Sequence, residues 1–240
     1  MLASYLRGRL ARAPCSFPPS PRRRFHICLQ QALAERAGRE CQGAVPDHDD
    51  SEEAAKGMAR LFAEVGEAYT DLIATGAPEV LAPVEVLLDV ASHPDDAICS
   101  MTFNFWHRLG RALTVGLHPE PLESEEAPVT DDERQRRVAL FTPTLERLVA
   151  LIRGRVRFPD GFDGWHRDER QEFKRARMAV GDTLIDCALV LGGNHMLRLL
   201  VEPLLQLSTR MSSGAQLFDW RTAEAALYCI RSADGACAGA

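Results

Sequence analysis

Apolar residues recur at intervals of three and four positions through most of the chain after residue 50, which is the spacing of one face of an α-helix. No segment shows a convincing strand pattern. Glycine, proline and polar residues divide the periodic region into separate helices. The pattern predicts seven helices, over residues 52–74, 79–91, 95–113, 131–155, 168–191, 195–211 and 219–233. The sequence therefore predicts an all-α fold.

The helix predicted over residues 95–113 is unusually apolar. Phe103 and Trp106 lie beside its main face, so the apolar surface is wider than an ordinary amphipathic stripe. The main face consists of five residues at helical spacing, namely Ile98, Met101, Phe105, Leu109 and Leu113. A helix with so wide an apolar surface needs neighbours on both sides, as in a layered array of helix pairs.

Short connections between the predicted helices indicate antiparallel pairs. The first helices of these pairs begin near residues 52, 95, 168 and 219, in steps of about 43, 73 and 51 residues. HEAT and armadillo units repeat every ~40–47 residues, and the long step contains two loops that read as insertions. The sequence predicts a HEAT-repeat α-solenoid fragment of about three to four helix pairs, whose last pair lacks its second helix.

Several residues are expected to begin or bend these helices. Ser92 and Asp95 are both candidates for the cap of helix 95–113. Thr130 with Glu133 three residues later fits a capping box at the start of helix 131–155. Pro143 is expected to kink that helix.

The first fifty residues differ from the rest in composition. From Met1 to Ala34 there are six arginines and no acidic residue. This composition is typical of an organellar transit peptide, and a wrongly predicted gene start is the alternative. The run Arg22–Arg24 is a weak match to a nuclear signal. The expected organisation is a disordered basic leader over 1–50, a helical-repeat segment over 51–233 and a disordered tail over 234–240.

The overall composition, 46% hydrophobic and 26% charged with a formal net charge of −6, is that of a soluble globular protein. A mildly acidic body argues against direct nucleic-acid binding and allows basic protein partners. No run of eighteen apolar residues is present, so no membrane insertion is expected. Seven cysteines are widely spaced without a CxxC motif, and those in the apolar helices, at positions 99, 187 and 229, are expected to be buried free thiols in a reducing compartment.

The sequence offers no residue set with catalytic, cofactor-binding or metal-binding spacing. His93, His107, His166 and His195 are scattered and form no HExxH pair. Gly192-Gly193 lacks the lysine of a phosphate loop, and the serines near residue 210 lack a nucleophile elbow. We therefore expect a protein that is not an enzyme and needs no cofactor.

Trp106 and Trp220 each allow two interpretations. Tryptophan is frequent among the residues that anchor protein partners. Burial between repeats is the simpler interpretation for a tryptophan on an apolar helix face. The sequence favours burial for both residues.

Four stretches carry a family resemblance: LFAEVGEAYTDLI (61–73), EVLLDVASHPDDAICSMTFNFWHRLG (85–110), residues 171–190 and DWRTAEAALYCI (219–230). In this order they resemble the transportin-SR and importin-13 branch of the importin-beta superfamily of nuclear transport receptors. The resemblance covers about residues 51–233. It is most specific in the aromatic helix FNFWHRLGRAL and weaker over 114–167.

The resemblance implies middle HEAT repeats of a receptor several times longer. Such receptors bind protein cargo, SR-type splicing factors among them, and release it when Ran-GTP binds. Ran and nucleoporins are the other implied partners, and nucleus and cytoplasm the implied location. The family's main Ran-binding surface and its arginine-rich cargo helix are not matched here, so no cargo-contacting residue is assigned. The basic leader leaves an alternative open, an organelle-targeted helical scaffold located in the mitochondrion or plastid.

An acidic stretch, Glu120–Glu126 continued by Asp131–Glu133, is the most plausible functional patch in the sequence. It could steer basic partners electrostatically. A solvated insertion loop without function is the alternative.

Neutralising three acidic residues of this stretch separates the two interpretations. If the stretch steers a basic cargo, the association rate constant falls at low salt and depends less on ionic strength. The variant carries glutamine at Glu123, Glu125 and Glu126, and stopped-flow fluorescence measures the rate. Neutralising Glu64 and Asp71 on the first helix is the control. An unchanged rate constant means that the stretch is a solvated insertion.

Overall fold

The computed structural model describes residues 48–114, 130–212 and 219–237. In these ranges the chain forms ten α-helices, two short 3-10 helices and no β-strand. In chain order they are α3 (His48–Ala68), α4 (Thr70–Ala74), η1 (Pro78–Val80), α5 (Ala82–Ala91), α6 (Asp96–Ser100), α7 (Phe103–Thr114), α8 (Asp131–Val156), η2 (Phe162–Gly164), α9 (Arg167–Ala179), α10 (Gly181–Leu191), α11 (Gly193–Ser212) and α12 (Trp220–Cys237).

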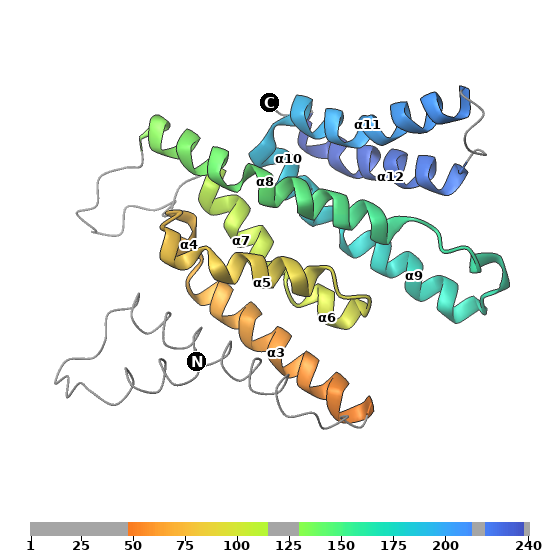
Figure 1. The fold of residues 1–240 in the computed structure, drawn as a ribbon, viewed down its shortest axis with the longest axis horizontal. Coiled ribbons are helices and arrows are strands. Elements are labelled where there is room, and N and C mark those ends of the chain that lie inside the picture. Colours follow the sequence, from red (N-terminus) through yellow and green to blue (C-terminus); the bar gives the residue numbers. More distant parts are fainter. Residues whose placement is uncertain (1–47, 115–129, 213–218, 238–240) are drawn as a thin grey trace, which may run out of the picture. The chain divides into compact units, whose positions relative to one another are not determined.

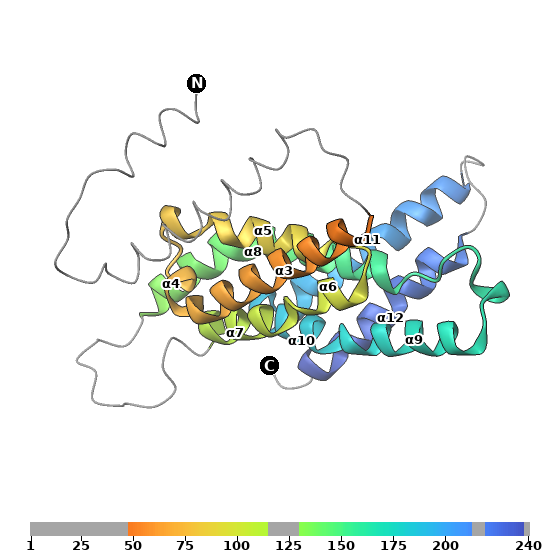
Figure 2. The ribbon, with the colours of Figure 1, turned by 90° about the horizontal axis from the view of Figure 1, so that it is seen from below.

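The helices are stacked in two layers of successive pairs (Figure 1, Figure 2). The first helices of the pairs are α3–α4, α6–α7, α9–α10 and α12. In this layer α7 contacts α3 and α4 on one side and α10 on the other, and α10 contacts α12. The second helices, α5, α8 and α11, each contact the first helix of their own pair and that of the next pair. This is the arrangement of an α-solenoid, so the predicted all-α repeat fold and the four predicted pair starts are confirmed.

Three helices that the periodicity predicts as continuous are each interrupted once. Helix 52–74 is α3 and α4, helix 95–113 is α6 and α7, and helix 168–191 is α9 and α10. At the first two interruptions a threonine hydroxyl donates to a backbone carbonyl, from Thr70 to Gly66 O at 2.9 Å and from Thr102 to Cys99 O at 2.9 Å. Such bonds compete with the regular helical ladder and bend it. The third interruption, at Val180, precedes Gly181, a weak helix former.

The ends of the helical segment extend beyond the predicted limits. Helix α3 begins at His48, and α12 continues to Cys237, so residues 48–50 and 234–237 are helical although disorder was expected. The predictions for the remainder of the leader and for the last three residues lie outside the described residues.

Asp95 and Thr130 are the observed helix caps. The Asp95 carboxylate accepts the backbone N–H of Ala97 at 2.8 Å, and the Thr130 hydroxyl accepts that of Glu133 at 3.3 Å. The hydroxyl of Ser92 instead donates to Asp89 O at 2.7 Å, at the end of α5. Helix α8 continues through Pro143.

The core is densest around α7. Phe105 and Trp106 are fully buried and form an edge-to-face pair with centroids 4.9 Å apart. Gly66 lets α3 approach this pair, because a Cβ there would lie 2.7 Å from Leu87 Cδ1 and 3.0 Å from Phe105 Cδ2. On the other side, Gly110 faces Asp186 of α10. The predicted burial of Trp106 is confirmed.

None of the described helices has the length and apolar composition to span a membrane alone. The segments Arg167–Leu191 and Gly193–Thr209 meet such criteria only together, and a bend of 120° separates them.

Replacing Trp106 tests its role in this core. Trp106→Ala should lower the free energy of unfolding by about 3–5 kcal/mol, because the cavity lies among rigid helices. For a segment of this size the melting temperature should fall by roughly 6–20 °C. Differential scanning calorimetry measures the change. Trp106→Phe is the matched control and should cost less, since it keeps most of the ring contact and removes an indole N–H that is buried without a partner. An unchanged transition for Trp106→Ala would contradict a core role.

Candidate protein-interaction surface

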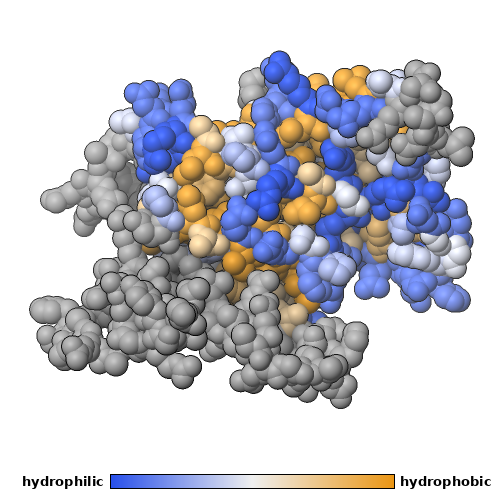
Figure 3. Space-filling model, in the orientation of Figure 1, coloured by the Kyte–Doolittle hydropathy of each residue, from blue (hydrophilic) through white to orange (hydrophobic). Residues whose placement is uncertain are grey.

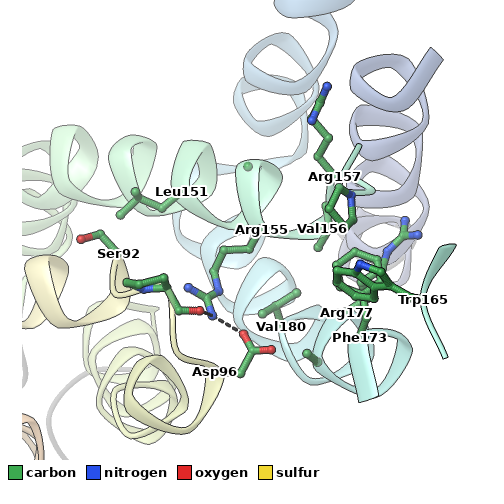
Figure 4. Close-up of a pocket in the computed structure, with 14 residues that line it drawn as sticks. Ser92, Asp96, Leu151, Arg155, Val156, Arg157, Trp165, Phe173, Arg177 and Val180 are labelled. Atoms are coloured by element: carbon green, nitrogen blue, oxygen red, sulfur yellow. Dashed lines mark hydrogen bonds and ion pairs between the residues drawn. The ribbon is translucent and has the colours of Figure 1, made fainter. Parts of the chain in front are cut away.

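A groove of about 470 Å³ opens at one edge of the stack (Figure 4). Its walls come from the α5–α6 turn, the last turn of α8, the loop after it and helix α9. Apolar atoms of Leu151, Val156, Trp165, Phe173 and Val180 line much of it. The groove separates α6 from α9, the N-terminal parts of two successive first helices, whereas their C-terminal parts α7 and α10 are in close contact.

Arg155 is one of four charged residues that line this groove, with Asp96, Arg157 and Arg177. Its guanidinium donates to the carbonyl oxygen of His93 and pairs with the carboxylate of Asp96 (Figure 4). Only 16% of the Arg155 side chain is exposed. Arg155 therefore ties the end of α8 to the α5–α6 turn and leaves the groove walls mainly apolar.

An aromatic cluster forms the far wall of the groove and continues to α12. Phe158 lies within 4.7 Å of Phe162 and 5.5 Å of Phe173 between ring centroids. Trp165 lies 5.9 Å from Phe173 in an edge-to-face arrangement, and Phe158 lies 5.8 Å from Trp220. Such offset and edge-to-face contacts stabilise by about 0.5–1.5 kcal/mol per pair beyond area burial. The sequence interpretation missed this cluster, and its signal was four aromatic residues within positions 158–173.

Arg177 of α9 is held inside the cluster. Its guanidinium carbon lies 4.3 Å from the centroid of Phe158 and 4.1 Å from that of Tyr228, and Nη2 is 2.6 Å from Glu224 Oε1. The Tyr228 hydroxyl donates to Arg177 O at 2.9 Å. These contacts join α9 to α12, forty to fifty residues further along the chain.

Trp220 is exposed, and the expectation that it packs between repeats is wrong. It is 46% exposed and lies on the same face of α12 as Leu227, which is 59% exposed. The buried face of α12 consists of small residues, namely Ala225, Ala226, Cys229 and Ala233. These small side chains let α12 approach α10 and α11 closely, so the bulky stripe faces outward. Elsewhere, apolar patches alternate with charged residues on the face drawn in Figure 3.

The histidines occupy separate places in the fold. His107 Nδ1 lies 3.0 Å from Asp186 Oδ2 and joins α7 to α10, and His195 Nε2 lies 2.7 Å from Glu146 Oε1 and joins α11 to α8. His166 forms a capping box with Glu169 at the start of α9. In the described part of the chain, no three side chains of His, Cys, Asp or Glu converge in a way that could hold a metal ion.

Cys99, Cys187 and Cys229 are buried free thiols, as the sequence predicted. Burial raises the pKa of all three, and for Cys187 and Cys229 to about 12. Thiols with such pKa values are protonated at neutral pH and are poor nucleophiles.

Of the predicted acidic patch, only Asp131–Glu133 is described, and Glu120–Glu126 lies outside the described residues. Asp131 and Asp132 are exposed in the first turn of α8, where they complement the helix dipole. Glu133 bonds to Arg136 and Arg137, and these hydrogen bonds lower the pKa of its carboxyl to about 2.

Comparison with known proteins shows what the first pairs are similar to. Residues 49–153 match the family of the second TPR domain of transportin-3 and importin-13. This segment is similar to that domain. TPR and HEAT units are both helix pairs that stack on their neighbours, which is the arrangement observed.

The transportin relationship extends over most of the chain. Over 189 residues, 79% of this chain, it is 43% identical to transportin MOS14 of Arabidopsis thaliana. It is 28% identical over 189 residues to the mRNA transport regulator MTR10 of Saccharomyces cerevisiae, and 26% identical over 197 residues to an uncharacterized protein of Schizosaccharomyces pombe, covering 78% and 76% of this chain. It spans 19%, 17% and 19% of these relatives, about a fifth of their length. No solved structure matches the chain.

The start of α12 is tied to the loop that carries Phe158 through Asp219. Its Oδ1 accepts the N–H of Arg221 at 3.2 Å, and its Oδ2 accepts the hydroxyl of Thr222. Arg157 Nη2 lies 3.4 Å from Oδ2. The Thr222 hydrogen bond, followed by the charge of Arg157, lowers the pKa of the Asp219 carboxyl.

Removing the Asp219 carboxylate should destabilise the segment in a pH-dependent way. Asp219→Ala should lower the free energy of unfolding by about 1 kcal/mol at neutral pH, as for other helix caps. The pKa of the Asp219 carboxyl is lower in the folded state than in the unfolded state, where it is about 3.9. The stabilisation by this carboxylate is therefore fully present above the unfolded-state pKa and is lost as the pH falls through the lower folded-state pKa. Urea unfolding of both proteins from neutral pH toward about pH 3 measures the difference. Asp182→Ala in α10 is the control, and a pH-independent difference for Asp219→Ala would contradict the argument.

Proposed function

We propose that this chain is a cargo-binding segment of a nuclear import receptor of the karyopherin-β class. It binds protein cargo, with SR-type splicing factors as the candidate class, and Ran-GTP releases that cargo from the complete receptor. Nucleoporins are the partners during passage between cytoplasm and nucleus. The segment acts by binding and performs no chemistry.

The identity of 43% over 189 residues with a protein named a transportin carries this proposal. The match covers most of the helical stack, so it includes surface as well as core. The yeast relative is named an mRNA transport regulator, which is also a transport function. Because the chain spans about a fifth of these relatives, release by Ran-GTP is proposed for the whole receptor and cargo contact for this segment.

The stacked pairs are physically suited to such a role. Most contacts of each pair are with its neighbours, so small rotations between pairs accumulate along a longer array and let its surface adapt to different partners. The net charge of −6 favours association with basic proteins. The groove between α6 and α9 and the exposed stripe of Trp220 and Leu227 add apolar surface that a partner can cover.

The organellar scaffold has only the composition of residues 1–34 in its favour. Those residues lie outside the described part of the chain, and the relatives with functional names are transport proteins. We therefore propose nuclear transport and not an organellar function.

A chimeric receptor tests the proposal. Residues 49–233 replace the corresponding segment of transportin MOS14, and the chimera is expressed in cells that lack the endogenous receptor. If the segment contributes to cargo transport, a fluorescent SR-type protein accumulates in the nucleus to nearly the level supported by the parent receptor. Quantitative microscopy measures the nuclear-to-cytoplasmic ratio.

Two controls make this result interpretable. A chimera carrying Trp106→Ala should lose import because its core is disrupted, and a helical-repeat insert of equal length from an unrelated solenoid should also fail. A chimera that folds with a normal melting transition but leaves the cargo in the cytoplasm would overturn the proposal.

A further inference from the structure

Helix α9 is attached to the rest of the described structure by few side chains. Arg177 is its one buried residue, Phe173 and Ala176 are half-buried, and the other positions are exposed. The groove lies along its side that faces α6. Detaching α9 therefore uncovers little of the apolar core, which lies under α7 and α10.

Arg177 is the main fastening between α9 and α12. The guanidinium lies between the rings of Phe158 and Tyr228 and pairs with Glu224 at 2.6 Å. The guanidinium carbon also lies 5.8 Å from the ring centroid of Phe173 (Figure 4). Cation–π contacts of a desolvated arginine are stabilising, so this one side chain fastens the helix.

Several buried polar atoms near the contacts of Arg177 have no hydrogen-bond partner. Within the described residues, five buried side-chain nitrogen or oxygen atoms lack a hydrogen-bond partner, and three of them are Arg177 Nε, Arg221 Nε and Glu224 Oε2. A buried donor or acceptor without a partner destabilises the state that contains it. Opening this region gives these atoms access to water, so the closed arrangement is less stable than its contacts alone suggest.

The chain on either side of α9 is suited to movement. At the C-terminal end the helical ladder is interrupted at Val180, whose N–H bonds to Met178 O, and Gly181 follows. A Cβ at Gly181 would meet no atom within 4 Å, so the side of the helix at Gly181 is open, although the preceding Val180 is buried. At the N-terminal end the capping box of His166 and Glu169 keeps α9 intact as a unit.

We propose that α9 is a strap that opens away from α12. Release of Arg177 from Phe158, Tyr228 and Glu224 lets α9 pivot at Val180–Gly181. Opening widens the groove against α6 and exposes the rings of Phe158 and Phe173. The inner helix α10 stays packed between α7 and α12 throughout.

Hydrogen exchange of the full chain, followed by mass spectrometry, tests the strap. A detached helix of thirteen residues is marginal in water, so amides of 167–179 should exchange by local opening while those of 183–191 remain protected. Arg177→Ala should accelerate exchange in 167–179 by about tenfold without changing 183–191. Gly181→Ala, which favours helix at the pivot, should slow exchange in 167–179. Arg175→Ala, an exposed arginine of the same helix, is the matched control and should leave both regions unchanged.

The protection of 183–191 shows whether each variant is folded. Equal acceleration of both regions by Arg177→Ala would overturn the proposal, because Arg177 would then support the whole stack and not a movable strap. An Arg177→Ala variant with unchanged exchange in 167–179 would show that Arg177 does not hold α9 against α12. A Gly181→Ala variant with unchanged exchange there would overturn the pivot.

Discussion

The stack depends on the burial of α7 between its neighbours. Phe105 and Trp106 project from one turn of α7, and each large apolar side chain stabilises the fold by roughly 1.5–3 kcal/mol when it leaves water. This burial requires close approach of the neighbouring helices, which Gly66 permits on the side of α3. The wide apolar surface of segment 95–113 is therefore the consequence of a helix with neighbours on two sides. The other pairs repeat this relationship with smaller residues.

Arginines of α8 set how the pairs sit against one another. Arg136 donates to Thr75 O at 2.8 Å, Arg147 pairs with Glu85 at 2.7 Å, and Arg155 bonds to the α5–α6 turn. Exposed pairs of this kind contribute about 0–1 kcal/mol each, so they add little to the stability of the core. Their effect is to fix the orientation of α8 relative to the first two pairs. The half-buried Arg155 has a second effect, since it also shapes the floor of the groove.

Apolar spacing predicts which segments are helical and which positions share a face, and this sufficed for the seven helical regions and for the order of the pairs. It does not reveal hydroxyl-to-carbonyl bonds such as those of Thr70 and Thr102, so two of the three interruptions were missed, and the third, before Gly181, interrupts no apolar period. Nor does it reveal which face of α12 meets a neighbour. The bulky stripe of Trp220 and Leu227 suggested the inner face, but the small residues Ala226 and Cys229 are buried because they permit closer helix packing. The aromatic cluster joins a loop to two helices, and no local period encodes such contacts.

The interruptions divide the first helices of the second and third pairs into a tightly packed inner part and a less tightly packed outer part. The inner parts, α7 and α10, pack directly on one another, whereas the outer parts, α6 and α9, are separated by the groove. A continuous, straight first helix would carry the close contact along its full length and leave no such space. In the third pair the interruption at Val180 leaves the outer part α9 with one buried residue, whereas the inner part α10 is packed between α7 and α12. The movement proposed for α9 would therefore add adaptability at this edge of the stack, next to apolar surface suited to a partner, beyond rotations between pairs.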